Sequence, residues 1–249
     1  MFSLRHIVFL SIAVAACAAL VTVFRKKDLS FWINLLFGVG IVSETVKVFS
    51  YIIANEETLG GYLPKTDLPF HLCSIQLIFF AILKFSSNEK LKRLIMAFMI
   101  PSCLVGGAAA LLIPTASSLA MPAISIQYFS YHAAIIAFAI HLMTFGRIDW
   151  TVKDYLHSLY MLVFLAFVAI YLNSICYELL SLSEAGAEFA GRVNFMYVVD
   201  PPVSGLPFLN EDHGWLVYIV HYAATAVAAV TLCYLPVLLK KKKKASGEE

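Results

Sequence analysis

Residues 123–145 read AISIQYFSYHAAIIAFAIHLMTF, and this stretch, with six others like it, decides the fold. It holds no Lys, Arg, Asp or Glu, and its length matches the roughly 20 residues that a helix needs to cross a bilayer. The other apolar segments lie at residues 6–24, 31–53, 69–85, 91–113, 154–176 and 214–239. The sequence therefore predicts an all-α membrane protein with seven transmembrane helices.

The composition excludes a water-soluble domain. Of the 249 residues, 61% are hydrophobic and only 14% are charged, and the mean hydropathy is +0.82. A soluble domain carries roughly 25% charged residues, so lipid must be the solvent of this chain. We expect an integral, multi-pass membrane protein, in the plasma membrane if bacterial, surrounded by membrane lipids and without a nucleic-acid partner. The five cysteines form no C-x-x-C pair, and we expect neither a metal nor a cofactor.

The basic residues predict the orientation in the membrane. Fourteen of the eighteen Lys and Arg residues lie in the first, third and fifth loops and in the C-terminal tail. By the positive-inside rule, the N-terminus is expected outside and the C-terminus in the cytoplasm. We predict one seven-helix domain over residues 1–239, followed by a basic cytoplasmic tail over residues 240–249.

The last loop, residues 177–213, is long, acidic and on the predicted outer side. Its centre, residues 193–202, reads VNFMYVVDPP, which is too apolar and aromatic for a solvated linker. Long ordered loops are often lids or binding loops, so we expect this one to pack back on the helices.

Polar residues gather in the outer halves of the predicted helices. At about 1.5 Å of rise per residue, Glu44 and Lys47 both lie in the outer half of their helix, where they share a face and can pair. Ionisable residues are costly within a membrane and are functional candidates by default. The sequence therefore predicts an outer-half cavity lined by substrate-binding or supporting residues, namely His6, Glu44, Lys47, His71, Gln127, Tyr128, Asn173, Asn194, Tyr197, His213 and His221.

The stretch from Asp67 to Ser74 hints at chemistry. Asp67 suits the N-cap of the third helix and Pro69 suits its first turn. A helix N-terminus favours a thiolate, so Cys73 is a candidate nucleophile at the depth of phospholipid ester carbonyls. His71 lies ~200° around the helix from Cys73, and we therefore expect the base to come from another helix, with His132 as the leading candidate. The alternative is a buried structural cysteine.

Residues 68–75, LPFHLCSI, resemble the L-P-L-H-L-C-S-I signature of the YwaF-like family of integral membrane proteins, which groups with vertebrate transmembrane protein 164. Supporting pieces follow in the family's order: His6, Ser43-Glu44, residues 129–132, Asn173 and residues 191–197. Ala133 and Phe195 depart from the pattern, where the family has a glycine and a tyrosine. The resemblance implies a seven-span fold. For the vertebrate relatives it also implies a cysteine-dependent acyltransferase that acts on lysophospholipids, with Cys73 as the acyl-carrying residue.

Two other classes of function fit the same residues. His71 and His132, with His213 or His221, are candidate zinc ligands of a lipid hydrolase, although no H-x-x-x-H spacing supports this. A solute-binding or transport protein is the other alternative, with Glu44 and Lys47 in its binding site.

Overall fold

The computed structural model describes residues 3–54, 56–59, 63, 65–115, 118–119, 121–146, 148–181, 193–201, 208–209 and 214–246. Within these residues the secondary structure is helical, without a β-strand. The helices in chain order are α1 (Leu4–Phe24), α2 (Leu29–Ala54), α3 (Glu56–Leu59), η1 (Lys65–Asp67), α4 (Leu72–Phe85), α5 (Glu89–Pro101), η2 (Ser102–Gly106), α6 (Gly107–Leu112), α8 (Pro122–Thr144), α9 (Val152–Ser181), η3 (Phe195–Tyr197) and α11 (Trp215–Ser246).

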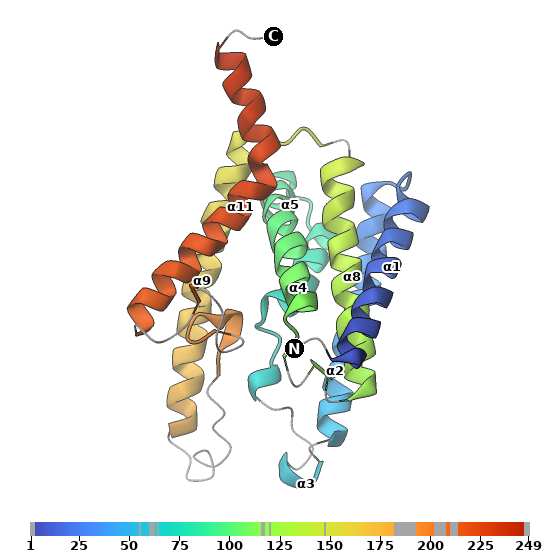
Figure 1. Ribbon diagram of the computed structural model, residues 1–249, viewed down its shortest axis with the longest axis vertical. Helices are drawn as coiled ribbons and strands as arrows, with labels where there is room; N and C mark the ends of the chain where they lie inside the picture. The colour runs from blue at the N-terminus through green and yellow to red at the C-terminus, as the bar shows by residue number, and fades with distance from the viewer. Residues whose placement is uncertain are drawn as a thin grey trace.

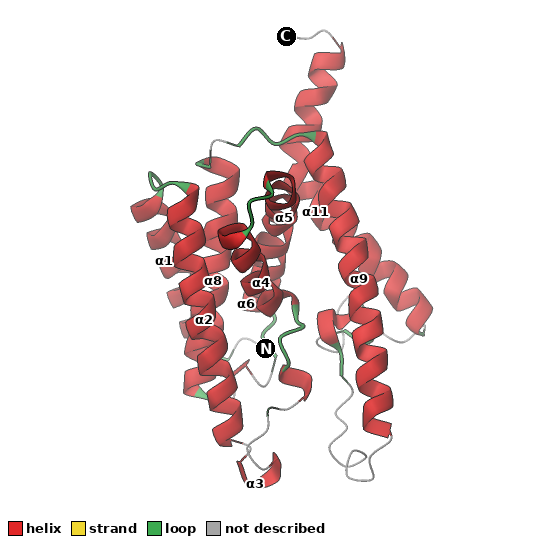
Figure 2. Cartoon of the chain, turned by 180° about the vertical axis from the view of Figure 1, so that it is seen from behind, coloured by secondary structure: helices red, strands yellow, loops and turns green. Residues whose placement is uncertain are grey.

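The helices form one bundle with α4 and α5 in the middle (Figure 1). On one side, α8 packs against both α1 and α2, and α2 packs against α4. On the other side, α5 packs against α9, which packs against α11 (Figure 2). Helices α1, α4, α8 and α11 all begin at the same end of the bundle, which we call the Cys73 end.

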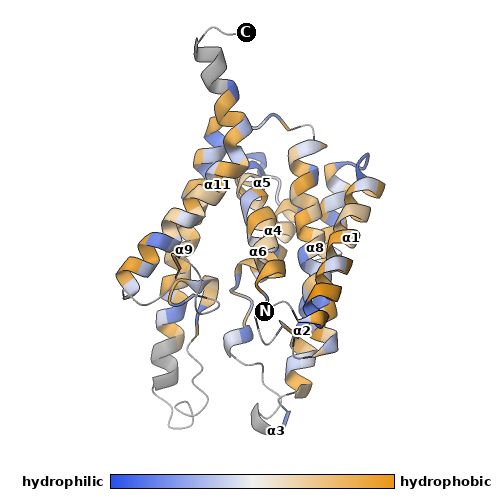
Figure 3. Ribbon diagram, in the orientation of Figure 1, coloured by the Kyte–Doolittle hydropathy of each residue, from blue (hydrophilic) through white to orange (hydrophobic). Residues whose placement is uncertain are grey.

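The outer faces of the helices are apolar (Figure 3), and large side chains such as Phe164, Phe167 and Leu232 are exposed on them. Six of the described helices are long and apolar enough to cross a membrane. They coincide with six of the predicted segments. The seventh, α4, has 14 residues and is about 21 Å long, shorter than a bilayer core of about 30 Å. The all-α membrane fold is therefore confirmed, whereas seven complete crossings and their orientation remain predictions.

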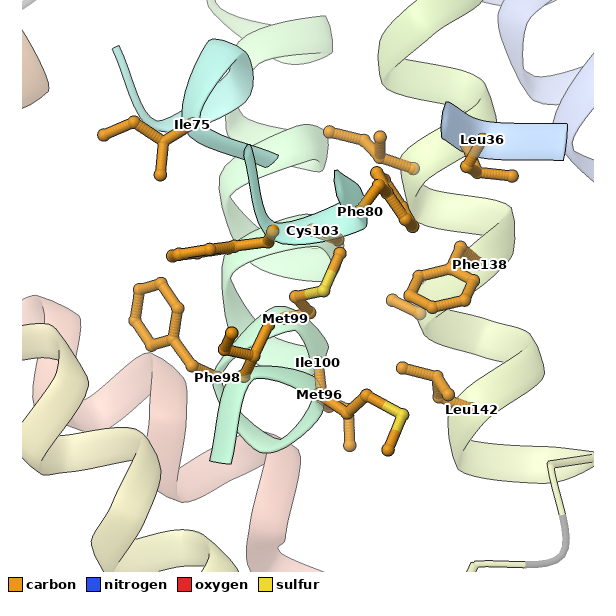
Figure 4. Close-up of a cluster of buried hydrophobic side chains, with 14 of the residues drawn as sticks. Leu36, Ile75, Phe80, Met96, Phe98, Met99, Ile100, Cys103, Phe138 and Leu142 are labelled. Atoms are coloured by element: carbon orange, nitrogen blue, oxygen red, sulfur yellow. The ribbon is translucent and has the colours of Figure 1, made fainter. Parts of the chain in front are cut away.

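The hydrophobic core lies where α2, α4, α5 and α8 meet (Figure 4). Phe80, Phe98 and Phe138 are almost fully buried there, together with Leu36 and Met99. This packing holds the short α4 between two helices that are long enough to span the membrane.

The helix that follows α4 is interrupted by a π-helical turn, η2, directly after Pro101. Proline has no N–H, so it cannot bond the carbonyl of Ala97 one turn earlier. The hydroxyl of Tyr234 on α11 donates to that carbonyl instead, over 2.9 Å. After the turn, a Cβ added to Gly107 would lie 2.8 Å from Cγ1 of Ile136 on α8. Glycine at this position therefore permits the close approach of the two helices.

The predicted start of the third helix is wrong. The structure begins α4 at Leu72 with His71 at the N-cap, whereas Asp67 ends the short helix η1. Between them Phe70 N–H donates to the carbonyl of Leu68 over 2.7 Å, which makes a tight turn around Pro69. This turn takes the chain out of helical geometry at Pro69, so the helix starts later than the apolar pattern suggests. Cys73 is consequently the second helical residue.

Candidate active site at the start of α4

Cys73 lies in the first turn of α4, where the backbone N–H groups have no partner within the helix. Its carbonyl accepts a hydrogen bond from the hydroxyl of Tyr131 on α8, at 3.0 Å. Tyr131 is 5% exposed, so this bond ties the start of α4 to the middle of α8 inside the bundle.

His132, the residue after Tyr131, is 3% exposed. Its Nδ1 lies 2.7 Å from the carbonyl oxygen of Tyr128. A carbonyl only accepts, so Nδ1 carries the proton and Nε2 keeps its lone pair. The ring also packs on the Tyr128 ring, with centroids 4.3 Å apart. These contacts orient an imidazole that is in the tautomer a general base requires.

The predicted pairing of Glu44 and Lys47 is confirmed. Nζ of Lys47 lies 2.6 Å from Oε1 of Glu44, and it also donates to Oγ of Ser74 over 3.1 Å. Ser74 Oγ in turn donates to Oε2 of Glu44 over 3.3 Å. One turn further along the same face of α2, Tyr51 bonds the carboxyl group of Asp67. The face of α2 that carries these residues is therefore turned toward α4 and the chain before it.

His71 does not face Cys73 as a partner. Its Nε2 donates to the carbonyl of Thr66 over 3.2 Å. Its ring lies against Phe195 and Tyr197, with centroids 5.5 Å and 5.6 Å away. The histidine therefore joins the turn before α4 to the last loop. Because His71 is the N-cap of α4 and not part of the helix, the ~200° helical spacing from Cys73 does not apply to it.

The loop segment Val193–Asp200 packs on the bundle, as its apolar sequence predicts. Asn173 of α9 holds Phe195 by two hydrogen bonds. From α11, three side chains donate to three consecutive carbonyls of the loop: Tyr222 to Met196 over 2.6 Å, Tyr218 to Tyr197, and Trp215 to Val198 over 3.0 Å. Within the segment, Asn194 accepts from the N–H of Val199 over 3.1 Å and donates to the carbonyl of Asp200 over 2.7 Å. Hydrogen bonds from α9 and α11 thus hold the segment Val193–Asp200 beside the start of α4, and we call this clamped segment the loop wall.

This wall contains backbone strain. Met196 and Tyr197 have φ angles of 56° and 55°, which is the left-handed region that residues other than glycine rarely adopt. Such conformations persist only where surrounding contacts enforce them, and they cluster at functional sites. The phenol of Tyr197 lies close enough to Cys73 to interact with it electrostatically, and burial raises the pKa of Tyr197 to about 12.

Other predicted site residues act as links between helices. Gln127 donates to Oγ of Ser43 over 2.5 Å, and Nε2 of His6 donates to the carbonyl of Leu111 over 2.9 Å. The His221 ring forms no hydrogen bond or ion pair with another described residue, and His213 lies outside the described residues.

The described residues contain no group of three or more His, Cys, Asp or Glu side chains that could hold a metal ion. The alternative zinc site comprises His71 and His132 with either His213 or His221. His213 lies outside the described residues, and the other three histidines form no such group. A cavity between α2, α4 and α5 lies at the opposite end of the bundle from Cys73, and Asn34, Lys84 and Lys92 are among its lining residues.

The sequence interpretation missed three residues at the start of α4 and on the loop wall. Tyr131 donates to the carbonyl of Cys73, Ser74 accepts from Lys47, and Tyr222 donates to the carbonyl of Met196 in the loop. Their hydroxyl groups within apolar segments could have identified them, because a buried hydroxyl group normally finds a hydrogen-bond partner.

Residues 1–234 of the chain match the TMEM164 family. The chain belongs to the TMEM164 family. The match spans α1 through α9 and reaches Tyr234 in α11, so Cys73, His132 and the clamped loop of this TMEM164 family member all lie within it. Family membership and the six long apolar helices make it an integral, multi-pass membrane protein. Neither a curated protein nor a solved structure matches the chain.

Proposed function

We propose that this protein is a membrane acyltransferase that moves fatty acyl chains between phospholipids and lysophospholipids through a thioester on Cys73. The observation that carries the proposal is the junction of α4 and α8. There the carbonyl of Cys73 is bonded by Tyr131, and the next residue, His132, is held with Nε2 unprotonated. Membership of the TMEM164 family supports it, because the resemblance of residues 68–75 implies this chemistry in the vertebrate relatives.

The proposed reaction has two halves. In the first, Nε2 of His132 takes the proton of the Cys73 thiol, and the sulfur attacks the ester carbonyl of a phospholipid. The C–O bond breaks, the proton passes to the leaving alkoxide, and a lysophospholipid departs. In the second half, the hydroxyl group of an acceptor lysophospholipid gives its proton to His132 and attacks the thioester carbonyl. The C–S bond breaks, and His132 returns the proton to the sulfur, which restores the thiol. These two reaction steps need neither a metal nor a redox cofactor.

The proposed setting is a seven-helix domain over residues 1–239 with the Cys73 end outside and the basic tail, residues 240–249, in the cytoplasm. In this setting Cys73 lies near the membrane interface, where ester carbonyls lie; its position in the first turn of the short α4 supports this. The clamped segment Val193–Asp200 then lies beside the entering acyl chain.

The direct test uses the purified protein in lipid nanodiscs with a phospholipid that carries an isotope-labelled acyl chain. We expect a hydroxylamine-sensitive acyl adduct on the Cys73 peptide by mass spectrometry, and transfer of the label to added lysophospholipid. Cys73→Ser should abolish both while the thermal unfolding midpoint stays near that of the unchanged protein.

Cys233→Ser is the matched control, because Cys233 is a half-buried thiol in α11. It should retain transfer. If Cys73→Ser transfers acyl chains at the original rate, the cysteine mechanism is wrong.

A further inference from the structure

Three polar side chains form a closed ring between α2 and the first turn of α4. Lys47 contacts both Glu44 and Ser74, and Ser74 donates back to Glu44. The side chains of Lys47 and Glu44 are only 15% and 22% exposed. The ring is anchored at Ser74, which directly follows Cys73.

Joining α4 to a neighbouring helix does not require charged side chains. A turn further along α4, Gln76 donates to Ser102 and accepts from the thiol of Cys103, so neutral groups join α4 to η2. A charged residue within a membrane helix costs about 2.5–3.5 kcal/mol on insertion scales. A Glu–Lys pair in place of a neutral pair therefore calls for a role beyond helix packing.

The position of the ring indicates that role. Burial of the Cys73 sulfur is the largest effect and opposes a thiolate, the charge of Lys47 favours the thiolate, and the charge of Glu44 opposes it. An ammonium group has three N–H donors, and the contacts with Glu44 and Ser74 engage two of them. The other ionisable groups near Cys73 or Lys47 on the packed elements are Glu44, Asp67, His71, Tyr128, Tyr131 and Tyr197. Lys47 carries the ammonium group of this cluster.

We propose that Lys47 is the cation that stabilises the Cys73 thiolate, and that Glu44 and Ser74 are positioning residues that hold its ammonium group at the first turn of α4. When the thiol ionises, its proton leaves to a base and Lys47 keeps its own. The negative charge on sulfur is then balanced by an ammonium whose two other donors are already fixed. This inference deepens the proposed function, which supplies the base and the acyl ester.

The test measures the rate at which iodoacetamide alkylates Cys73 as a function of pH, in nanodiscs, by mass spectrometry of the Cys73 peptide. Lys47→Met should raise the pH midpoint of alkylation by about one unit and slow the reaction about 10-fold below that midpoint. Lys47→Arg should retain most of the rate, because it keeps the charge.

Glu44→Gln separates an electrostatic role from a structural one. The glutamine oxygen can still accept from Lys47, and Ser74 keeps its own bond to Lys47, so the ammonium group stays in place. The negative charge that opposes the thiolate is removed, so alkylation should become faster and its midpoint lower. If the ring only packs the helices, Glu44→Gln and Lys47→Met should change the rate in the same direction or leave it unchanged, and either result would overturn the proposal.

Two further variants complete the test, one as a control and one as a replacement if Lys47→Met does not fold. Lys84→Met is the matched control, since Lys84 joins α4 to α2 through Asn34 at 2.6 Å but lies at the other end of α4. It should leave the profile unchanged. If Lys47→Met does not fold, the double variant Glu44→Gln/Lys47→Met removes both charges together and leaves no unpaired carboxylate, and its midpoint should still rise.

Alkylation involves no lipid, so the two proposals fail separately. A Lys47-dependent profile without acyl transfer contradicts the proposed function alone. Acyl transfer that depends on Cys73, with an alkylation profile that Lys47→Met leaves unchanged, contradicts the role of Lys47 alone.

Discussion

Asn173 and Phe195 exchange two hydrogen bonds, one in each direction. The side-chain Oδ1 of Asn173 accepts from the backbone N–H of Phe195 over 2.8 Å, and its Nδ2 donates to the carbonyl of Phe195 over 3.2 Å. Both residues are buried, so the pair fastens the last loop to α9 without access to water.

Asn173→Ala should loosen this loop. The buried N–H and carbonyl of Phe195 would lose their partners, which costs about 1–3 kcal/mol of folding free energy for each unsatisfied group. We expect a lower thermal unfolding midpoint in detergent and reduced acyl transfer. Ser174→Ala is the control, because Ser174 bonds only the carbonyl of Ile170 within α9 and is exposed. Equal midpoints for the two variants would contradict the clamp.

Tyr234 and Pro101 should be energetically coupled. Tyr234→Phe leaves the carbonyl of Ala97 without its donor in a dry core, and we expect a loss of about 1–3 kcal/mol. Pro101→Ala supplies a backbone N–H one turn after Ala97, so Tyr234→Phe should cost less in that background. A double-mutant cycle by chemical unfolding measures the difference, and an additive result would rule out the exchange of donors.

His132→Asn separates the roles of the two ring nitrogens of this histidine. The asparagine amide N–H can take the place of Nδ1 and keep the bond to Tyr128, but it has no Nε2. We expect His132→Asn to keep its stability and to lose at least about 100-fold in the rate of acylation. The rate is measured by single-turnover formation of the labelled thioester. A His132→Asn protein with the original rate would show that the base lies elsewhere.

Asp67→Asn should change how stability depends on pH. Burial raises the pKa of Asp67 above its ordinary value, despite the opposing effects of Thr66, Lys47 and Tyr51. The stability from this protonated group is present below the unfolded pKa of about 3.9 and is lost as pH rises through the higher folded pKa. Asparagine does not titrate, so the unfolding midpoint of the variant relative to the unchanged protein should rise as the pH increases from about 4 through the higher folded pKa of Asp67. A difference that falls over that range would mean that ion pairing outweighs burial.

Gly107→Ala should separate α6 from α8. The added Cβ would lie 2.8 Å from Cγ1 of Ile136, and we expect overpacking to cost about 1–3 kcal/mol. Gly38→Ala on α2 is the control, because its Cβ would meet nothing within 4 Å. In that helix the alanine should stabilise by up to about 1 kcal/mol. Both values follow from chemical unfolding, and a Gly107→Ala protein as stable as Gly38→Ala would contradict the close approach.

Much of the fold was predictable from the sequence, because the hydrophobicity of a membrane helix is a local property. Six predicted apolar segments match long helices, and the Glu44–Lys47 pair follows from a three-residue spacing on one helix. The start of α4 was not predictable in the same way. Asp67 and Pro69 suit a helix start equally well in isolation, and the turn between Leu68 and Phe70 decides against them.

The sequence by itself determined a multi-pass α-helical protein with Cys73 at the beginning of an apolar helix. The reason is that the length and polarity of each segment depend only on consecutive residues. The tertiary structure alone decided what surrounds that thiol. Tyr131 of α8 donates to the carbonyl of Cys73, Lys47 of α2 donates to the adjacent Ser74, and the strained loop at Met196 and Tyr197 is held by α9 and α11. Such contacts join residues that are distant in sequence, and they depend on how whole helices pack, which no single segment encodes.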